Sequence, residues 1–293
     1  MKQLIIFLCL AAGWAGFAQD ATAVADTTKH WTTKGTLTAL FNQSTFDNWL
    51  AGGENNISGT AAVNYDFNYK KDNWSWDNKV IASYGLVKTK TSSFAKKTDD
   101  RLELNSLLGK RVEPESKWYY SAFLNFRTQF TKGYTYGTDV NGAETRVEYT
   151  NFLSPAYLSF GPGIMWKRDD NLKFNLAPAT SKITIVDKSF TLPEDAYFGV
   201  QEGESIRYEL GLNASGYYKF VVMANVSFEN ILNLYSNYLE DPQNVDIDYQ
   251  LNIVLKINKY LTTNIAFQTI YDDNAYRGFQ VRQVFGVGFN YGF

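Results

Sequence analysis

The sequence is poor in the residues that build thiol, metal and Ser–His sites. Among its 293 residues there is one cysteine, Cys9, and one histidine, His30. Because Cys9 lies in an apolar N-terminal run, we expect no thiol in the mature chain, which excludes a disulfide framework and a thiolate metal site. Because a nucleophilic serine is usually activated by a histidine base, His30 alone, ahead of the first expected strand, argues against a lipase-type triad. We therefore expect no catalytic residue, no metal and no cofactor.

Long apolar stretches are also scarce. Residues 4–18 are mostly apolar, follow Lys2 and end on Ala15-Gly16-Phe17-Ala18. This pattern is typical of a secretory signal peptide over residues 1–18 and is too short for a spanning helix. Residues 19–33 are expected to form a short periplasmic tail, too small for the plug of a TonB-dependent transporter. A formal net charge of −2 gives no electrostatic reason to expect a nucleic-acid partner.

Aromatic residues are abundant instead, at 16% of the chain. In residues 281–293, large apolar side chains alternate with small or polar ones, so that one face of a strand would be apolar and the other polar. A transmembrane β-barrel shows this alternation, with lipid outside and a polar lumen inside. The terminal Phe293 resembles the signal that outer-membrane proteins present to the barrel-assembly machinery. We therefore expect outer-membrane lipid and that machinery as partners.

Eleven further segments show the same alternation over about ten residues, the length that a tilted strand needs to cross a bilayer. The twelve expected strands span 34–42, 57–69, 74–88, 101–112, 118–131, 150–166, 171–186, 205–215, 219–234, 245–257, 261–271 and 281–293. A change of phase in the seventh segment predicts a β-bulge near Pro178-Ala179-Thr180. Residues 34–293 would thus form one closed, all-β antiparallel barrel.

The expected connections alternate in length along the chain. Those after odd-numbered strands are long, and those after even-numbered strands are tight turns, such as the one expected at Gly216–Tyr218. Bacterial outer-membrane barrels place long loops outside and short turns in the periplasm, which also makes both termini periplasmic. Aromatic residues flank the short turns and predict a girdle at the periplasmic interface: Tyr69, Trp74, Trp76, Trp118, Tyr119, Trp166, Tyr217, Tyr218 and Tyr260.

The expected inward positions carry eight charges of each sign. The basic ones are Lys34, Lys79, Arg101, Arg111, Arg127, Arg207, Lys256 and Arg282, and the acidic ones are Asp66, Asp77, Glu103, Glu209, Glu229, Asp246, Asp248 and Asp272. Twelve strands lie between the filled eight-stranded barrel and the open sixteen-stranded porin. The charges could pair and close the lumen, or they could line a small pore. Tyr119, Phe123, Tyr157 and Met165 also point inward and favour partial filling.

Candidate loop and lumen residues follow from this layout. In the first long connection, Trp49 and Leu50 lie beside two glycines and close to Glu54. They could bind a ligand or form an ordered cap. In the lumen the candidates are Arg127, Asp246 and Asp248, and at the last long connection Asp272 and Asp273. The latter pair could in principle activate water without a histidine or hold a weak Ca²⁺ ion, but solvated loop charge is the simpler interpretation.

Several motifs carry a family resemblance: Asn48-Trp49 with Gly52-Gly53-Glu54-Asn55, Tyr84-Gly85-Leu86, Thr128-Gln129-Phe130 with Gly133-Tyr134, Asn237-Tyr238-Leu239-Glu240 through Pro242-Gln243-Asn244-Val245-Asp246, and Tyr271-Asp272-Asp273. With them the chain resembles the DUF3078 family of uncharacterised Bacteroidetes outer-membrane proteins, from about Trp31 to Phe293. The resemblance implies an outer-membrane location in a Gram-negative cell and assigns no catalytic residue.

Because transport, scaffolding and catalysis share the barrel architecture, function is a separate inference. The leading hypothesis is a non-enzymatic, porin-like barrel, a narrow channel for small solutes gated by its first extracellular loop. The second is a structural or accessory subunit of an outer-membrane or secretion complex, with another envelope protein as partner. A lipid-modifying enzyme is the third.

Overall fold

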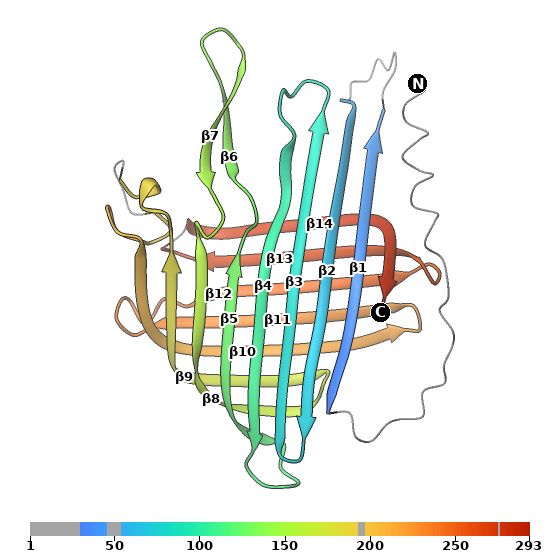
Figure 1. Ribbon diagram of the computed structural model, residues 1–293, viewed down its shortest axis with the longest axis vertical. Helices are drawn as coiled ribbons and strands as arrows, with labels where there is room; N and C mark the ends of the chain where they lie inside the picture. The colour runs from blue at the N-terminus through green and yellow to red at the C-terminus, as the bar shows by residue number, and fades with distance from the viewer. Residues whose placement is uncertain (1–29, 46–53, 193–196, 275) are drawn as a thin grey trace. The chain divides into compact units, whose positions relative to one another are not determined.

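The computed structural model describes residues 30–45, 54–192, 197–274 and 276–293. Residues 31–293 form one compact unit. Its strands, coloured along the chain in Figure 1, are β1 (Trp31–Ser44), β2 (Asn56–Lys71), β3 (Trp74–Thr89), β4 (Lys96–Arg111), β5 (Trp118–Thr128), β6 (Gly133–Thr138), β7 (Glu144–Thr150), β8 (Ala156–Asp169), β9 (Leu172–Ile185), β10 (Ile206–Met223), β11 (Val226–Asn237), β12 (Asp246–Lys256), β13 (Leu261–Asp272) and β14 (Tyr276–Gly292). A single 3₁₀ turn, η1 (Lys188–Phe190), is the only helical element of the described residues, and no described helix is long and apolar enough to cross a membrane.

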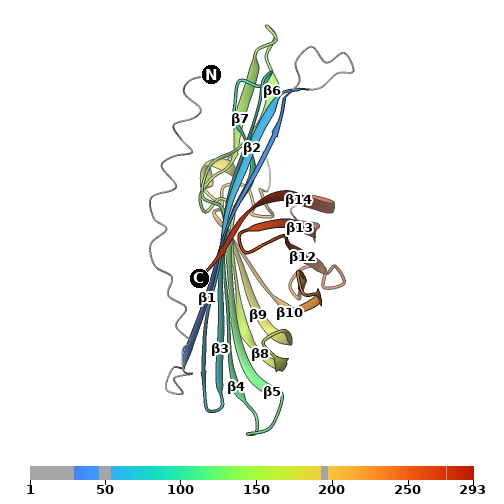
Figure 2. The same ribbon diagram turned by 90° about the vertical axis from the view of Figure 1, so that its right-hand side faces the viewer.

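Twelve of the described strands close into one antiparallel barrel, as the alternation predicts, while β6 and β7 form a separate two-stranded sheet. Closure occurs where β1 pairs with β14, with Thr36 opposite Gly292 and Leu40 opposite Gly288. The first and last strands of the barrel therefore leave no free sheet edge between them. In Figures 1 and 2 the strands of opposite walls cross at a wide angle, because strands tilt relative to the axis of a closed barrel.

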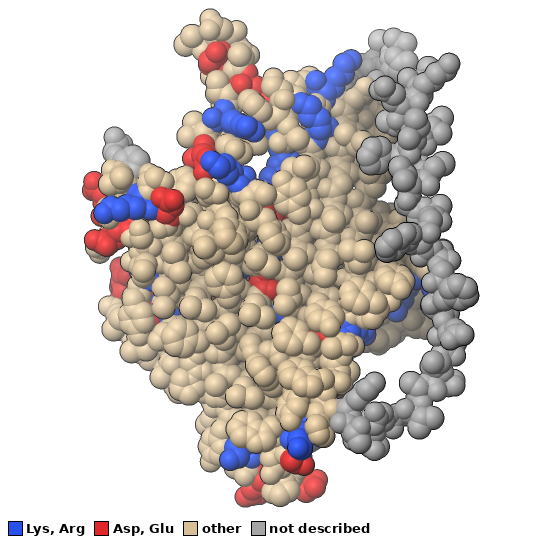
Figure 3. Space-filling view, viewed as in Figure 1, with Lys and Arg blue, Asp and Glu red and all other residues tan. Residues whose placement is uncertain are grey.

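The outer face of the barrel is apolar. On β14, Phe285, Phe289 and Tyr291 are 62%, 69% and 56% exposed, whereas Gly286 and Gly288 on the other face are buried. In Figure 3 the Lys, Arg, Asp and Glu side chains gather mainly at the two ends of the molecule, with few on the face between. The predicted alternation of faces is thus confirmed, and it gives a hydrocarbon-compatible surface around a polar interior.

The connections sort by length only partly as predicted. The fifth expected connection contains the β6–β7 hairpin, so the barrel strand that follows begins at Ala156 and not at residue 150. Residues 144–150 do alternate, but they pair with β6 and not with a barrel strand. The last expected connection is reduced to residues 273–275, because β14 pairs with β13 as far as Tyr276. The predicted alternation therefore holds only in part: residues 90–95 and 112–117 form connections of equal length, and residues 273–275 form a shorter connection than residues 257–260.

The predicted turn at Gly216–Tyr218 is wrong. β10 continues through these residues, and the chain reverses at residues 224–225, between Met223 and Val226. Gly216 faces outward opposite Phe174, and a Cβ there would lie 3.2 Å from a ring carbon of Phe174. This glycine therefore leaves room for the Phe174 ring of the neighbouring strand and does not mark a chain reversal. The turn lies several residues further along the chain than predicted, but there is still one turn between two strands, so the number of barrel strands is unchanged.

The girdle prediction changes as a consequence. Tyr217 lies mid-strand and points into the lumen, and Tyr119 is buried at 6% exposure. Trp74, Trp118 and Tyr260 are 42%, 53% and 53% exposed beside short turns, as predicted. Near the true β10–β11 turn, the rings of Phe220 and Phe228 stack on neighbouring strands with their centroids 5.3 Å apart.

The predicted bulge near Pro178-Ala179-Thr180 is confirmed. On β10, Gly211 faces Thr180 and Asn213 faces Ala177, so β9 carries one more residue than its partner over this stretch. Such an insertion exchanges the faces of the residues that follow. It turns Lys182 toward the lumen, where it becomes part of the site described below.

Candidate functional site

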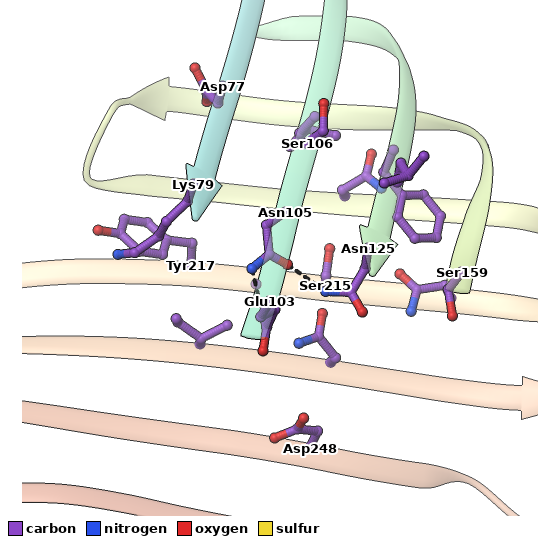
Figure 4. A pocket seen from close by; sticks show the side chains of 18 of the residues that line it. Asp77, Lys79, Glu103, Asn105, Ser106, Asn125, Ser159, Ser215, Tyr217 and Asp248 are labelled. Atoms are coloured by element: carbon purple, nitrogen blue, oxygen red, sulfur yellow. Dashed lines mark hydrogen bonds between the residues drawn. The ribbon is translucent and has the colours of Figure 1, made fainter. Parts of the chain in front are cut away.

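The lumen contains a cavity of about 530 Å³. It is lined from both walls by polar side chains, among them Asn105 on β4, Asn125 on β5, and Ser215 and Tyr217 on β10. In Figure 4 these side chains project between β3–β5 in front and the crossing strands behind. Asn125 donates to Asn105 Oδ1 at 2.6 Å, and Asn105 donates to a Glu103 carboxylate oxygen at 2.6 Å. The twelve-stranded barrel is therefore neither filled nor wide open.

Ion pairs cross the lumen near the short-turn end. Asp77 on β3 accepts from Lys167 on β8 at 2.9 Å and from Lys173 on β9 at 2.7 Å. One layer further in, Lys79 on β3 contacts Glu229 on β11 at 2.8 Å, and the Tyr217 hydroxyl donates to the same carboxylate at 2.9 Å. In the barrel order β11 lies opposite β3, and β8 and β9 are separated from it by β4 and β5, so these contacts cross the lumen.

A second layer of cross-lumen contacts lies toward the long connections. Arg127 on β5 pairs with Asp248 on β12 at 2.7 Å, so the structure brings two of the predicted lumen residues into direct contact. Arg101 on β4 donates to Glu103 at 2.9 Å and to Gln250 on β12 at 2.9 Å. Arg127 and Asp248 line the cavity, as do Asp77 and Lys79 of the first layer, so both layers narrow the lumen at the cavity itself.

Lys182 is the centre of an acidic cluster at the rim of the cavity. Its ammonium lies 2.7 Å from Asp246, 3.5 Å from Glu209 and 3.7 Å from Asp272. Carboxylate oxygens of Asp246, Asp272 and Asp273 lie within 4.8 Å of one another. The ammonium thus supplies positive charge where three of the predicted candidates converge. Asp273 also accepts from the Asn244 side chain at 2.9 Å.

Sequence reasoning missed three lysines that face this interior: Lys167, Lys173 and Lys182. The alternation pattern could have identified two of them, Lys173 and Lys182. Their neighbours Leu172, Phe174 and Ile183 are expected to face outward. Alternation then places Lys173 and Lys182 inward. Lys167 was assigned to a turn, but it is the last inward residue of β8 and only 7% exposed. Its role depends on the strand end, which patterns locate poorly.

The candidates in the first long connection are only partly described. Trp49 and Leu50 lie outside the described residues. Glu54 is exposed and accepts hydrogen bonds from the Thr91 hydroxyl and from the Thr91 backbone N–H, the latter at 2.9 Å. These bonds hold the pKa of the Glu54 carboxyl below its usual value. Glu54 therefore links the first and second long connections and does not reach the lumen cavity.

A sequence model of the family described as "Protein of unknown function (DUF3078)" matches residues 41–134. The match runs from the end of β1 to the start of β6. It includes one member of each cross-lumen contact, such as Asp77 and Arg127, while their partners lie beyond it. No curated protein matches the chain.

Solved structures with a similar arrangement include three bacterial proteins. The β domain of the Bordetella autotransporter BrkA is 9% identical, with 90% of this chain and 99% of that chain covered and a TM-score of 0.34. The translocator domain of the autotransporter NalP from Neisseria meningitidis is 8% identical, with 91% and 90% covered and a TM-score of 0.36. The outer membrane channel DcaP of Acinetobacter baumannii is 9% identical, with 90% and 97% covered and a TM-score of 0.33. At these identities and TM-scores the likenesses carry no information about function.

Proposed function

We propose that this chain is a non-enzymatic outer-membrane barrel that forms a narrow conduit for small polar solutes. The observation that carries the proposal is the closed barrel with an apolar, aromatic outer face and a polar lumen that holds a cavity of about 530 Å³. An apolar outside and a polar inside suit a barrel in lipid. Short turns at one end and longer connections at the other support periplasmic termini and extracellular long connections.

The same lumen accounts for the narrowness of the conduit. The pair of Arg127 and Asp248 spans the lumen toward the long connections, and the pair of Lys79 and Glu229 spans it toward the short turns. Charged side chains that constrict a pore limit the flow of ions through it. The described side chains thus restrict passage, and the predicted gating by the first connection through Trp49 and Leu50 would add to this restriction.

Planar-bilayer conductance tests the proposal. The double variant Arg127→Ala with Asp248→Ala removes one cross-lumen pair without changing net charge. We expect small conductance steps from the wild-type protein and steps at least severalfold larger from the double variant. The matched control is Lys132→Ala with Glu148→Ala, which removes an exposed pair of 2.6 Å at the β6–β7 hairpin and should leave the steps unchanged.

Silence from the folded wild-type protein and from the double variant would overturn the conduit and favour an accessory subunit. A quadruple variant that adds Trp49→Ala and Leu50→Ala to the double variant separates gating from constriction. A further rise in conductance would support a contribution from the first connection.

A further inference from the structure

Three residues that line the lumen cavity each carry a polar atom without a protein partner. These atoms are Asn175 Nδ2, Asn213 Oδ1 and the Tyr235 hydroxyl oxygen, each buried and lacking a hydrogen bond within the described residues. Their side chains are only 5%, 7% and 7% exposed, and all three residues line the cavity. Because a buried polar group without a partner costs about 1–3 kcal/mol, three such groups around one cavity indicate a ligand that satisfies them.

The barrel register places the three residues on one patch of wall. Asn213 on β10 lies directly opposite Tyr235 on β11. Asn175 on β9 lies opposite Ser215, which is two residues from Asn213 along β10 and on the same face. Neighbouring strands lie about 4.8 Å apart, so three adjacent strands present these groups within the span of one small molecule.

The orientation of each side chain is set by other contacts. The Asn213 amide nitrogen donates to the Leu234 carbonyl at 3.3 Å, which leaves its oxygen as the free acceptor. The Asn175 amide oxygen accepts from Ser121 at 2.6 Å, which leaves its nitrogen as the free donor. The Tyr235 ring lies over Gly211, where a Cβ would come 2.9 Å from the ring carbon that bears the hydroxyl. The patch therefore offers one donor, one acceptor and one hydroxyl that can act as either.

The charges that surround the cavity nearly cancel. Its lining includes six basic residues (Lys34, Lys79, Arg127, Lys173, Lys182 and Lys219) and seven acidic ones (Asp66, Asp77, Glu103, Asp170, Asp246, Asp248 and Asp272). Many of them already pair across the lumen, as Arg127 does with Asp248. A ligand with a net charge would leave one sign of the lining unmatched, whereas a neutral ligand would not disturb these pairs.

We infer that the wall patch of Asn175, Asn213 and Tyr235 binds a neutral polyhydroxyl molecule of the size of a mono- or disaccharide. Adjacent hydroxyls each donate and accept, which matches the free donor, acceptor and hydroxyl of the patch. Phe123 on β5 lines the same cavity and offers an apolar surface to the C–H groups of such a molecule. The volume of about 530 Å³ lies within the usual range for small-molecule sites. The inference rests on the proposed function, because the solute must reach the lumen.

Equilibrium binding of radiolabelled glucose and maltose to the purified, detergent-folded full chain tests this inference. We expect saturable binding at millimolar or lower concentration for at least one of the two sugars, and no competition from sodium glutamate or choline chloride. Tyr235→Phe removes the hydroxyl and keeps the ring over Gly211. Loss of one neutral hydrogen bond should weaken binding about fivefold. The matched control, Tyr218→Phe, alters an outward-facing tyrosine that is 41% exposed and should bind as the wild type does.

Asn213→Ala provides a second variant with the same expected direction. The inference is overturned if neither sugar binds saturably, in which case ordered water satisfies the three atoms, or if Tyr235→Phe and Asn213→Ala both bind as the wild type does. Because the measurement is made in detergent and needs no conduction, its failure is distinguishable from that of the conduit. Conductance without sugar binding would sink the inference alone, and sugar binding without conductance would sink the conduit alone.

Discussion

At the scale of single residues, the lumen contains charged side chains that pair with partners across it. Asp77 is the clearest case, because its side chain is 11% exposed and contacts both Lys167, at 7% exposure, and Lys173, at 20%. Removing one member of a buried ion pair leaves the others without compensation, and this usually costs more than the pair itself contributes. The carboxylate therefore matters most for keeping two ammonium groups inside the barrel.

We predict that Asp77→Asn destabilises the folded barrel by about 3 kcal/mol, the usual cost of breaking a buried ion pair. Equilibrium unfolding by urea in lipid vesicles measures the change. Asp169→Asn is the matched control, since Asp169 is 45% exposed and pairs with Arg168 next to it. Equal stability of the two variants would show that the lysines find other partners or lose their protons at little cost.

At the scale of elements, the β6–β7 hairpin is docked on the β3–β4 connection by few contacts. Glu144 on β7 pairs with Lys96 at 2.7 Å and accepts from the Ser93 backbone N–H at 2.7 Å. The Arg146 guanidinium lies over the ring of Phe94, 4.6 Å from its centroid. The hydrogen bond from Lys96, together with those from Ser92 and Ser93, lowers the pKa of Glu144 to about 2 from its ordinary value of 4.5.

This lowered pKa predicts a pH-dependent docking of the hairpin. A carboxyl with a depressed folded-state pKa stabilises the docked state fully above its ordinary pKa, and the stabilisation is lost as the pH falls through the folded value. We expect the amides of residues 133–150 to keep their hydrogen-exchange protection at neutral pH and to lose it progressively between about pH 4.5 and pH 2. Protection factors corrected for the intrinsic pH dependence are the measurement.

Glu144→Gln should abolish this pH dependence, whereas Glu148→Gln, at the base of the hairpin, should retain it. An unchanged profile in Glu144→Gln would assign the pH dependence to another carboxyl group. A flat profile in the wild type would assign the docking to the aromatic contact of Phe94 and Tyr136, whose ring centroids lie 6.1 Å apart.

How far the sequence determines these elements depends on the range of the contacts involved. Alternation reports which face a residue takes, and it correctly places Arg127, Asp248 and Phe289. It does not report which strand a segment pairs with, and so the sixth barrel strand is predicted to begin at residue 150, although Thr150 pairs with Gly133 of β6 and the barrel strand begins at Ala156. Gly216 was assigned to a turn because its role, contact with Phe174 on the neighbouring strand, exists only in three dimensions. The partner of each lumen charge is equally non-local, since it depends on closure of the whole barrel.

At the scale of the whole molecule, closure of the barrel depends on the pairing of β1 with β14, which we call the seam. Phe293 lies at this seam: its carbonyl accepts from the Gly35 N–H at 2.7 Å, and its N–H donates to the Gly35 carbonyl at 3.0 Å. Its ring lies over Gly35, where a Cβ would collide with the ring, and it stacks with Tyr65 at a centroid distance of 6.2 Å. The absence of a side chain at Gly35 thus lets the terminal ring cover the seam.

This contact gives Phe293 a role in the folded barrel besides the predicted role as an assembly signal, and two substitutions separate the roles. Gly35→Val displaces the ring but leaves the terminal aromatic residue in the chain, whereas Phe293→Ala removes it. We expect both variants, refolded in detergent without assembly factors, to lose about 1 kcal/mol of stability, the scale of an aromatic contact. Only Phe293→Ala should also lower the amount of heat-modifiable barrel recovered from cell envelopes.

Phe285→Ala is the matched control, because Phe285 is 62% exposed on the same strand and lies away from the seam. If Gly35→Val is as stable as the wild type while Phe293→Ala assembles poorly in cells, the Phe293 ring serves only as an assembly signal and does not stabilise the folded barrel. If both variants assemble normally and both unfold more easily, the ring acts only after closure, and recognition by the assembly machinery must depend on other residues of β14. The two roles coexist only if the seam variant is weaker in detergent and the terminal variant is weaker in both settings.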